Sequence, residues 1–187
     1  MPFELQPTLK GELVELRPLR ADDFDALYAV ASDPFVWELH PDRERYKEDV
    51  FREFFRVAME TGGAFLVTDP STNRVIGSTR YFGYDAERSE IEIGWTFLAR
   101  SHWGGRHNRE MKRLMLEHAF KFVDRVIFLV GPENFRSRRA VEKIGGIERG
   151  RVLKNDRESV VYEITAERFR TGPLQPVNPS PHREARE

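Results

Sequence analysis

The pattern of hydrophobic and polar positions predicts a strand and two amphipathic helices in the first third of the chain. Residues 13–19 alternate between apolar and polar side chains, as expected for a strand. Apolar residues then recur at helical spacing over residues 24–31, where Asp22 or Asp23 can cap the helix. A second helix is predicted over residues 46–60 and ends at a pair of glycines.

The middle of the chain predicts an antiparallel meander followed by a crossover. Strands are expected over residues 64–69, 75–82 and 90–98, with turn-forming residues between them. A helical pattern over residues 111–122 leads to the continuous apolar run 126–130, as in a strand buried on both faces. Strand, helix and strand form one crossover unit, so its two strands should be parallel neighbours.

The last third predicts a short helix, a hairpin and a tail. The helix covers residues 137–144, and the hairpin pairs residues 148–154 with residues 159–165. Four prolines and a charged end follow from residue 171. We therefore expect one domain over residues 1–170, and a tail over residues 171–187 that is either disordered or laid on a partner.

One turn joins the last strand of the meander to the long helix, and it contains Gly104 and Gly105. Glycines at the start of a helix let the backbone approach a ligand closely, and the free N–H groups and helix dipole there favour an anion such as a phosphate. Charge supports this interpretation. Residues 100–151 carry 13 Lys and Arg against 6 Asp and Glu, whereas residues 1–99 have a net charge of −8.

Composition narrows the class of protein. The 187 residues are 40% hydrophobic, which suits one globular domain with a full core, and no apolar run is long enough to span a bilayer. The absence of cysteine excludes disulfides and thiolate chemistry, and the five histidines show no paired ligand spacing. We expect a soluble, cytoplasmic protein without bound metal. The basic segment lacks interleaved exposed aromatics, so nucleic acid is not expected as a partner.

Three stretches of the chain carry a resemblance to a known family. They are "LVELRPLRADDFDALYAVASDP" near the start, the turn "HWGGRHN", and "ENFRSRRAVEKIGG". The chain resembles the GNAT acyl-CoA N-acyltransferases over about residues 13–165, in the branch that includes the ribosomal-protein-alanine N-acetyltransferases. The resemblance implies an α+β, three-layer fold: a mixed, mostly antiparallel sheet with a central parallel strand pair, flanked by helices. It also implies acetyl-CoA as co-substrate.

The resemblance assigns cofactor contacts to the glycine turn and to the segment after the crossover. Gly104 matches the first glycine of the family's pyrophosphate loop, but Arg106 stands at the second glycine and Ser101 at the leading Gln/Arg. Asn134 matches the contact to the pantetheine arm. The implied cofactor-binding set is Phe97, Leu98, Trp103, Gly104, Gly105, Arg106, His107, Asn108, Arg109, Asn134 and Arg138.

Two residues are candidates for the chemistry of acyl transfer. An amine must lose a proton before attack, and the leaving thiolate must be stabilised. Glu92 falls on the strand where many family members keep a carboxylate, although Glu90 lies on the same strand face and competes for the role. Ser137 matches the residue near the thioester sulfur, and it is equally well explained as a helix N-cap. Strand pairing can loosen near Gly94, and a free backbone N–H near residues 96–98 of a splayed strand could serve the oxyanion.

Other residues are candidates for the acceptor side. The loop containing Trp37 and His40 either lines a substrate pocket or forms a lid over the core, and Tyr81 is a further candidate contact. His118 is expected in the core, while His102 and His107 flank the glycines and can contact phosphate.

Two functions remain open at this stage. The first is an enzyme that moves an acetyl group from acetyl-CoA to a primary amine by direct attack in a ternary complex. The acceptor is then a protein or peptide N-terminus or a small molecule, and the enzyme a monomer or homodimer. The second is a non-catalytic acyl-CoA-binding sensor or interaction domain with the same fold.

Overall fold

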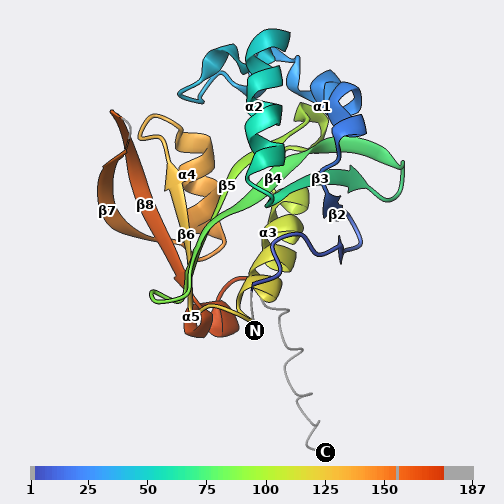
Figure 1. The fold of residues 1–187 in the computed structure, drawn as a ribbon. Coiled ribbons are helices and arrows are strands. Elements are labelled where there is room, and N and C mark those ends of the chain that lie inside the picture. The colour runs from blue at the N-terminus through green and yellow to red at the C-terminus, as the bar shows by residue number, and fades with distance from the viewer. Residues whose placement is uncertain (1–2, 155, 175–187) are drawn as a thin grey trace, which may run out of the picture.

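The protein is built on one eight-stranded sheet with helices on both faces (Figure 1). Its structure, a computed structural model, describes residues 3–154 and 156–174. The strand order is β1-β2-β3-β4-β5-β6-β8-β7. Neighbouring strands are antiparallel except for β5 and β6, which are parallel. The predicted fold class, with its central parallel pair, is confirmed.

The elements follow the hydrophobic pattern closely. The strands are β1 (Leu9–Lys10), β2 (Glu15–Pro18), β3 (Ala64–Asp69), β4 (Arg74–Asp85), β5 (Glu90–Leu98), β6 (Arg125–Val130), β7 (Ile147–Lys154) and β8 (Arg157–Thr165). The helices are α1 (Phe24–Ala31), α2 (Glu48–Glu60), α3 (Arg106–Ala119), α4 (Phe135–Lys143) and α5 (Ala166–Thr171). None of these helices, within the part of the chain described, is long and apolar enough to cross a membrane.

Two hydrophobic clusters hold the helices against the sheet. One joins α3 and α4 to the strands through buried side chains that include Leu16, Ile91, Ile93, Met111, Met115, Val126 and Tyr162. The other joins α1 and α2 to the sheet through Leu27, Trp37, Phe51, Phe55, Leu66 and Phe97. Burial of these apolar surfaces is the main favourable term in folding. The sheet is therefore a rigid frame between two helical layers.

The structure differs from the predicted pattern in two elements. In β6 only Val126, Phe128 and Val130 are buried, so one strand face is covered and the other is partly exposed. The prediction of a strand buried on both faces was wrong for β6, because α1 and α2 pack over other strands of that sheet face. In addition, the short pair β1–β2 extends the sheet at the edge where a single strand was expected.

Helix α1 begins without the expected side-chain cap. The carboxylate of Asp23 accepts two hydrogen bonds from Arg17, at 2.6 and 2.8 Å, and a third from the backbone N–H of Arg20. It therefore closes the preceding 3-10 turn, Ala21–Asp23, and pairs with a strand residue. Asp23 therefore forms an ion pair with Arg17 and does not cap α1 with its side chain.

The packed domain continues beyond residue 170. Leu174 is only 3% exposed and belongs to the core cluster with α3, and the carbonyl of Pro173 accepts a hydrogen bond from Arg109. The start of the proline-rich segment thus lies against the helix that follows the glycine turn. The remainder of the predicted tail, residues 175–187, lies outside the described residues.

Candidate active site

The two parallel strands at the centre of the sheet separate after a short paired stretch. Glu90, Ile91 and Glu92 pair with residues 125–127, and the described residues show no further pairing between β5 and β6. Beyond Glu92, the edge of β5 that faces β6 therefore has backbone groups without a strand partner. Ligands of open α/β sheets bind at the carboxyl ends of parallel strands, and unpaired backbone groups there are available to them.

A bulge bends β5 just after this point. Ser78 pairs with Phe97, and Arg80 pairs with Gly94, so Thr79 alone faces the two residues Trp95 and Thr96. Trp95 has a φ of 50°, which is strained for a bulky side chain and costs on the order of 1–3 kcal/mol. Strand pairing with β4 was expected to loosen near Gly94. The irregularity lies one residue further on.

A buried lysine on α3 forms hydrogen bonds to the residues of the bulge. The ammonium of Lys112, on α3, donates hydrogen bonds to the hydroxyls of Thr96 at 2.6 Å and Thr79 at 3.2 Å. Its side chain is 5% exposed, and no ion pair among the described residues includes it. Burial lowers the pKa of Lys112 to about 7. The sequence analysis missed this residue; its only signal was a lysine placed among the apolar positions of a helix.

Glu92 lies at the last paired position, where the strands begin to separate. It is 7% exposed, and none of the hydrogen bonds among the described residues involves its carboxylate. Burial raises the pKa of Glu92 to about 7, although the positive charges of Lys154 and Arg80 oppose the shift. Glu90 forms an ion pair with Arg125 at 3.3 Å. Of the two carboxylates, Glu92 is the one whose environment favours proton exchange near neutral pH.

A cavity of about 550 Å³ opens beside the bulge. Its walls include Phe54, Arg80 and Trp95, together with the loop of residues 41–45. The guanidinium of Arg80 lies 5.5 Å from the ring centroid of Phe54 and 4.9 Å from that of Trp95. Its Nε is buried without a hydrogen-bond partner, and burial lowers the pKa of Arg80 to about 10. The sequence analysis did not select Arg80, because a strand arginine is ordinarily exposed.

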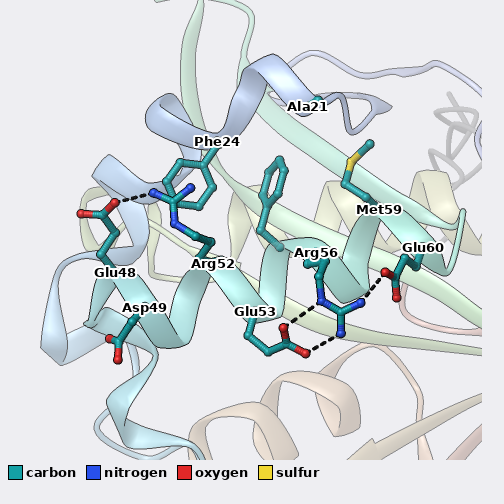
Figure 2. A pocket seen from close by; sticks show the side chains of 10 residues that line it. Ala21, Phe24, Glu48, Asp49, Arg52, Glu53, Arg56, Met59 and Glu60 are labelled. Atoms are coloured by element: carbon teal, nitrogen blue, oxygen red, sulfur yellow. Dashed lines mark hydrogen bonds and ion pairs between the residues drawn. The ribbon is translucent and has the colours of Figure 1, made fainter.

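A larger groove, of about 1020 Å³, runs along the outer side of α2 (Figure 2). Its charged side chains pair with one another along the helix: Arg52 with Glu48, and Arg56 with Glu53 and Glu60. None of its lining residues comes from β5 or from the glycine turn. This groove has no link to the candidate chemistry.

The glycine turn has the geometry of an anion site. Gly104 and Gly105 have φ values of 101° and 99°, in the left-handed region, and no atom lies within 4 Å of the position a Cβ would take at either residue. Gly105 is the N-cap of α3, and no side chain caps the helix there. The backbone N–H of Arg109 donates to the carbonyl of Gly105 at 2.8 Å. The N–H groups of Arg106, His107 and Asn108 precede this first intrahelical bond and are therefore the ones available to a diphosphate.

An aromatic and cationic contact links this turn to α4. The indole N–H of Trp103 donates to the carbonyl of Leu98 at 2.9 Å, and the guanidinium of Arg136 lies 3.9 Å from a Trp103 ring centroid. Arg136 also donates to the carbonyl of Val36 at 3.1 Å. One arginine therefore connects the glycine turn with the loop before α2.

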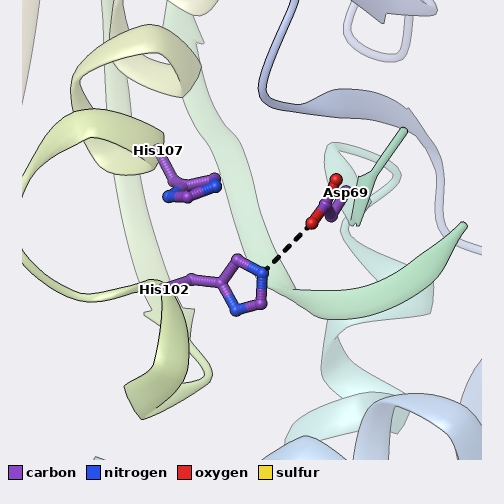
Figure 3. Close-up of side chains that lie close together, drawn as sticks. All are labelled: Asp69, His102 and His107. Atoms are coloured by element: carbon purple, nitrogen blue, oxygen red, sulfur yellow. Dashed lines mark hydrogen bonds and ion pairs between the residues drawn. The ribbon is translucent and has the colours of Figure 1, made fainter. Parts of the chain in front are cut away.

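The histidines that flank the glycines have their side chains directed toward the end of β3. His102 Nε2 lies 3.4 Å from Asp69 Oδ2, and the rings of His102 and His107 are 4.7 Å apart (Figure 3). Any phosphate contact of His107 is therefore left to its backbone N–H. This cluster was not predicted from the sequence, because Asp69 lies more than 30 positions from both histidines.

The first turn of α4 follows the carboxyl end of β6. Asn134, at 8% exposure, caps α4 by accepting a hydrogen bond from the backbone N–H of Ser137 at 3.1 Å. The cap is thus Asn134, and Ser137 lies inside the helix, which begins two residues earlier than expected. Arg138 donates to Tyr162, Pro132 and Glu148, so its guanidinium is engaged within the domain.

Several other candidates lie mainly in the core. Trp37 donates its indole N–H to Ala31 at 2.7 Å, and the hydroxyl of the fully buried Tyr81 donates to Met115. Neither side chain reaches the cavity beside the bulge. His40 accepts a hydrogen bond from the backbone N–H of Asp42, and burial lowers its pKa to about 3. The side chains of β5 residues Phe97 and Leu98 are also buried, which leaves only their backbone groups for a cofactor.

Comparisons with known proteins agree with this arrangement. A family model described as an acetyltransferase (GNAT) domain matches residues 14–147. Sequence comparison with curated proteins gave no significant match. Among solved structures, a GCN5-related N-acetyltransferase from Brucella melitensis is similar with a TM-score of 0.79 and 21% identity, over 90% of this chain and 83% of that chain.

Two further structures extend the comparison. An acetyltransferase of the GNAT family from Bacillus anthracis has a TM-score of 0.71 and 24% identity, over 86% of this chain and 99% of that one. RimJ from Mycobacterium smegmatis, solved in complex with CoA-disulfide, has a TM-score of 0.70 and 19% identity, over 90% of both chains. These likenesses concern the fold. With the family model covering most of the sequence, the chain belongs to the GNAT acetyltransferases and is an acyltransferase.

Proposed function

We propose that the protein transfers an acetyl group from acetyl-CoA to a primary amine, by direct attack in a ternary complex in the cytoplasm. One observation carries the proposal. The glycine turn at the start of α3 follows the end of β5 that has no pairing with β6, and Glu92 is the last residue of β5 that pairs with β6. This arrangement supports the enzyme over a non-catalytic sensor, because a sensor has no use for a buried carboxylate with a pKa near 7.

The chain's own groups supply the contacts proposed for acetyl-CoA. The backbone N–H groups of residues 106–108 would bind the diphosphate at the N-terminus of α3. The pantetheine arm would follow the unpaired edge of β5 at Phe97 and Leu98, with Asn134 on the opposite side. The thioester would then lie between the bulge and the first turn of α4, where Ser137 is located.

The reaction requires one proton to leave and one to be supplied. Glu92 accepts a proton from the ammonium of the acceptor, directly or through water, and the amine nitrogen attacks the thioester carbonyl. A C–N bond forms, and backbone N–H groups of residues 96–98 stabilise the oxyanion. The C–S bond then breaks, and the Ser137 hydroxyl stabilises the departing thiolate of CoA. The nitrogen loses its second proton as the amide forms, and the thiolate takes up one proton. An amide and CoA are the products.

The acceptor would enter through the cavity beside the bulge. Phe54 and Trp95 offer apolar walls, and Arg80 offers a guanidinium whose Nε has no hydrogen-bond partner among the described residues. A peptide N-terminus or a small amine fits a site of this kind. The resemblance to the ribosomal-protein-alanine branch favours the peptide.

Two measurements test the proposal. Acetyl-CoA and desulfo-CoA should both raise the melting temperature, since about 2.7 kcal/mol of stabilisation is expected at 100-fold excess over Kd. The release of CoA, followed with a panel of peptides and small amines, identifies the acceptor. The absence of a thermal shift with either ligand would contradict the cofactor assignment. Binding without turnover on any amine would favour the sensor.

A further inference from the structure

A cluster of potential metal ligands lies on the flank of the glycine turn that faces β3. Asp69, His102 and His107 each direct one ligand atom toward the others, and these atoms all lie within 4.8 Å of one another (Figure 3). His102 comes from the 3-10 turn Arg100–His102 and His107 from the first turn of α3, whereas Asp69 ends β3. Three elements therefore converge on one point.

Two neighbouring serines hold the side chains of Asp69 and His102 in position. Ser71 donates both its backbone N–H, at 2.8 Å, and its hydroxyl, at 2.7 Å, to Asp69 Oδ1. These two bonds fix the orientation of the carboxylate, whose other oxygen, Oδ2, faces His102. The hydroxyl of Ser101 lies 2.9 Å from His102 Nδ1, which orients that ring.

The separation of two of the ligand atoms fits a metal site. At 3.4 Å, the separation of His102 Nε2 and Asp69 Oδ2 is longer than the 2.7–3.2 Å of a good hydrogen bond. Tetrahedral zinc with bonds of about 2.0–2.2 Å places its ligand atoms about 3.4 Å apart. His107, whose side chain is only partly buried, can approach by a small rotation of its ring. Nitrogen and carboxylate donors are also the ligands that zinc and similar divalent metals prefer.

We propose that Asp69, His102 and His107 form a binding site for a divalent transition metal of the zinc class, with one coordination position left open. The two histidines lie on either side of Gly104 and Gly105. A bound metal therefore restrains the glycine turn and adds positive charge beside it. If the turn binds the diphosphate of acyl-CoA, as the proposed function requires, metal and acyl-CoA should strengthen each other's binding by the same factor. This coupling rests on the proposed function, whereas the metal site itself does not.

The test uses the full chain without an affinity tag, titrated with Zn²⁺ alone by calorimetry. We expect saturable one-to-one binding, weakened at least about tenfold by His107→Gln or Asp69→Asn, and by a comparable factor in Ser71→Ala, since outer-shell partners contribute about 10- to 100-fold. His182→Gln, at a histidine outside the described residues, is the control and should bind normally. Circular dichroism of each metal-free variant verifies folding.

The outcomes separate this proposal from the acyltransferase function. Absence of saturable Zn²⁺ binding, or unchanged binding by His107→Gln, would overturn the metal site whatever the protein does with acetyl-CoA. Calorimetry of CoA with and without Zn²⁺ then measures the coupling. Zn²⁺ binding that is sensitive to His107 but has no effect on CoA affinity would leave a metal site without the coupling, and would overturn that part of the proposal.

Discussion

The hydroxyl oxygens of Thr79 and Thr96 lie 2.8 Å apart across the bulge in β5, and the ammonium of Lys112 donates to both. A buried cation thus joins the helix after the glycine turn to the strand that carries Glu92. Because Lys112 has no carboxylate partner among the described residues, its charge costs stability and its hydrogen bonds fix the geometry of the bulge.

Replacing Lys112 with Met should reveal this cost as a function of pH. The folded pKa of about 7 lies below the usual 10.5, so the unfolded chain binds more protons between these values, and the lysine's contribution to the free energy of unfolding rises with pH. Lys112→Met should therefore be stabilised relative to the wild type most near pH 7, and this difference should shrink toward pH 10. Urea unfolding at several pH values measures it.

The control is Lys121→Met, at an exposed lysine just after α3. It should show no such pH-dependent difference. If the two variants behave alike, Lys112 is not held with a lowered pKa in the folded protein. The turnover number of Lys112→Met should also be measured. It should fall if the bulge positions the backbone N–H groups that stabilise the oxyanion.

Glu92→Gln should retain CoA binding and lose activity. A general base contributes about 10²- to 10⁴-fold in rate, and free amine becomes available without enzyme help as the pH rises, so the variant should recover in part at high pH. Wild-type kcat/KM should rise through pH 7 as Glu92 ionises. A pH profile of kcat/KM from about 6 to 10 checks both. Glu90→Gln is the matched control. If only Glu90→Gln loses activity, Glu90 is the base in place of Glu92.

The same carboxylate makes a separate prediction for stability. The pKa of Glu92 is raised from 4.5 to about 7 in the folded protein, so the folded chain binds more protons in this window and the contribution of Glu92 to stability falls as the pH rises. Glu92→Gln should therefore be more stable than the wild type above pH 7 and gain little near pH 4.5. If the difference in unfolding free energy between Glu92→Gln and the wild type is the same at both pH values, the carboxylate of Glu92 does not have a raised pKa in the folded protein.

Ser137→Ala should reduce kcat at every pH, because its proposed role is at the leaving thiolate and is independent of the amine's ionisation. The helix cap should persist, since Asn134 supplies it. Thermal unfolding verifies that stability is retained. A pH-dependent recovery like that of Glu92→Gln would place Ser137 on the proton path from the amine instead.

Gly104→Val should weaken CoA binding more than it weakens folding. Both glycines of the turn have left-handed backbone conformations, and a β-branched side chain would project into the open space above them. Gly150→Val is a matched control, because Gly150 has a φ of 121°, also borders open space and lies in β7. Calorimetry with CoA should separate the two variants. Normal binding by Gly104→Val would place the diphosphate elsewhere.

The sequence predicted the bounds of β3 and β5 correctly and those of β4 to within three residues, because alternation and turn residues are local signals. The roles of the glycine turn and Glu92 stay predictions. Lys112 and Arg80 escaped it, since the burial of a charged side chain depends on which helix or strand face meets the cavity. Asp69 escaped it because its partners lie more than 30 positions away. Tyr81 was selected as an acceptor contact because composition does not distinguish an aromatic of the core from one that lines a pocket.

The contact between Arg136 and Trp103 gives the protein an intrinsic optical reporter. Of its three tryptophans, Trp37 is buried in the core while Trp103 is 37% exposed beside the glycine turn. The emission of an indole depends on the polarity and charge around it, and here a guanidinium lies directly over the ring. A ligand that enters the turn changes that environment, so fluorescence titration can follow its occupancy in unlabelled protein. With Trp37 and Trp95 replaced by Phe, the signal would come from this one position.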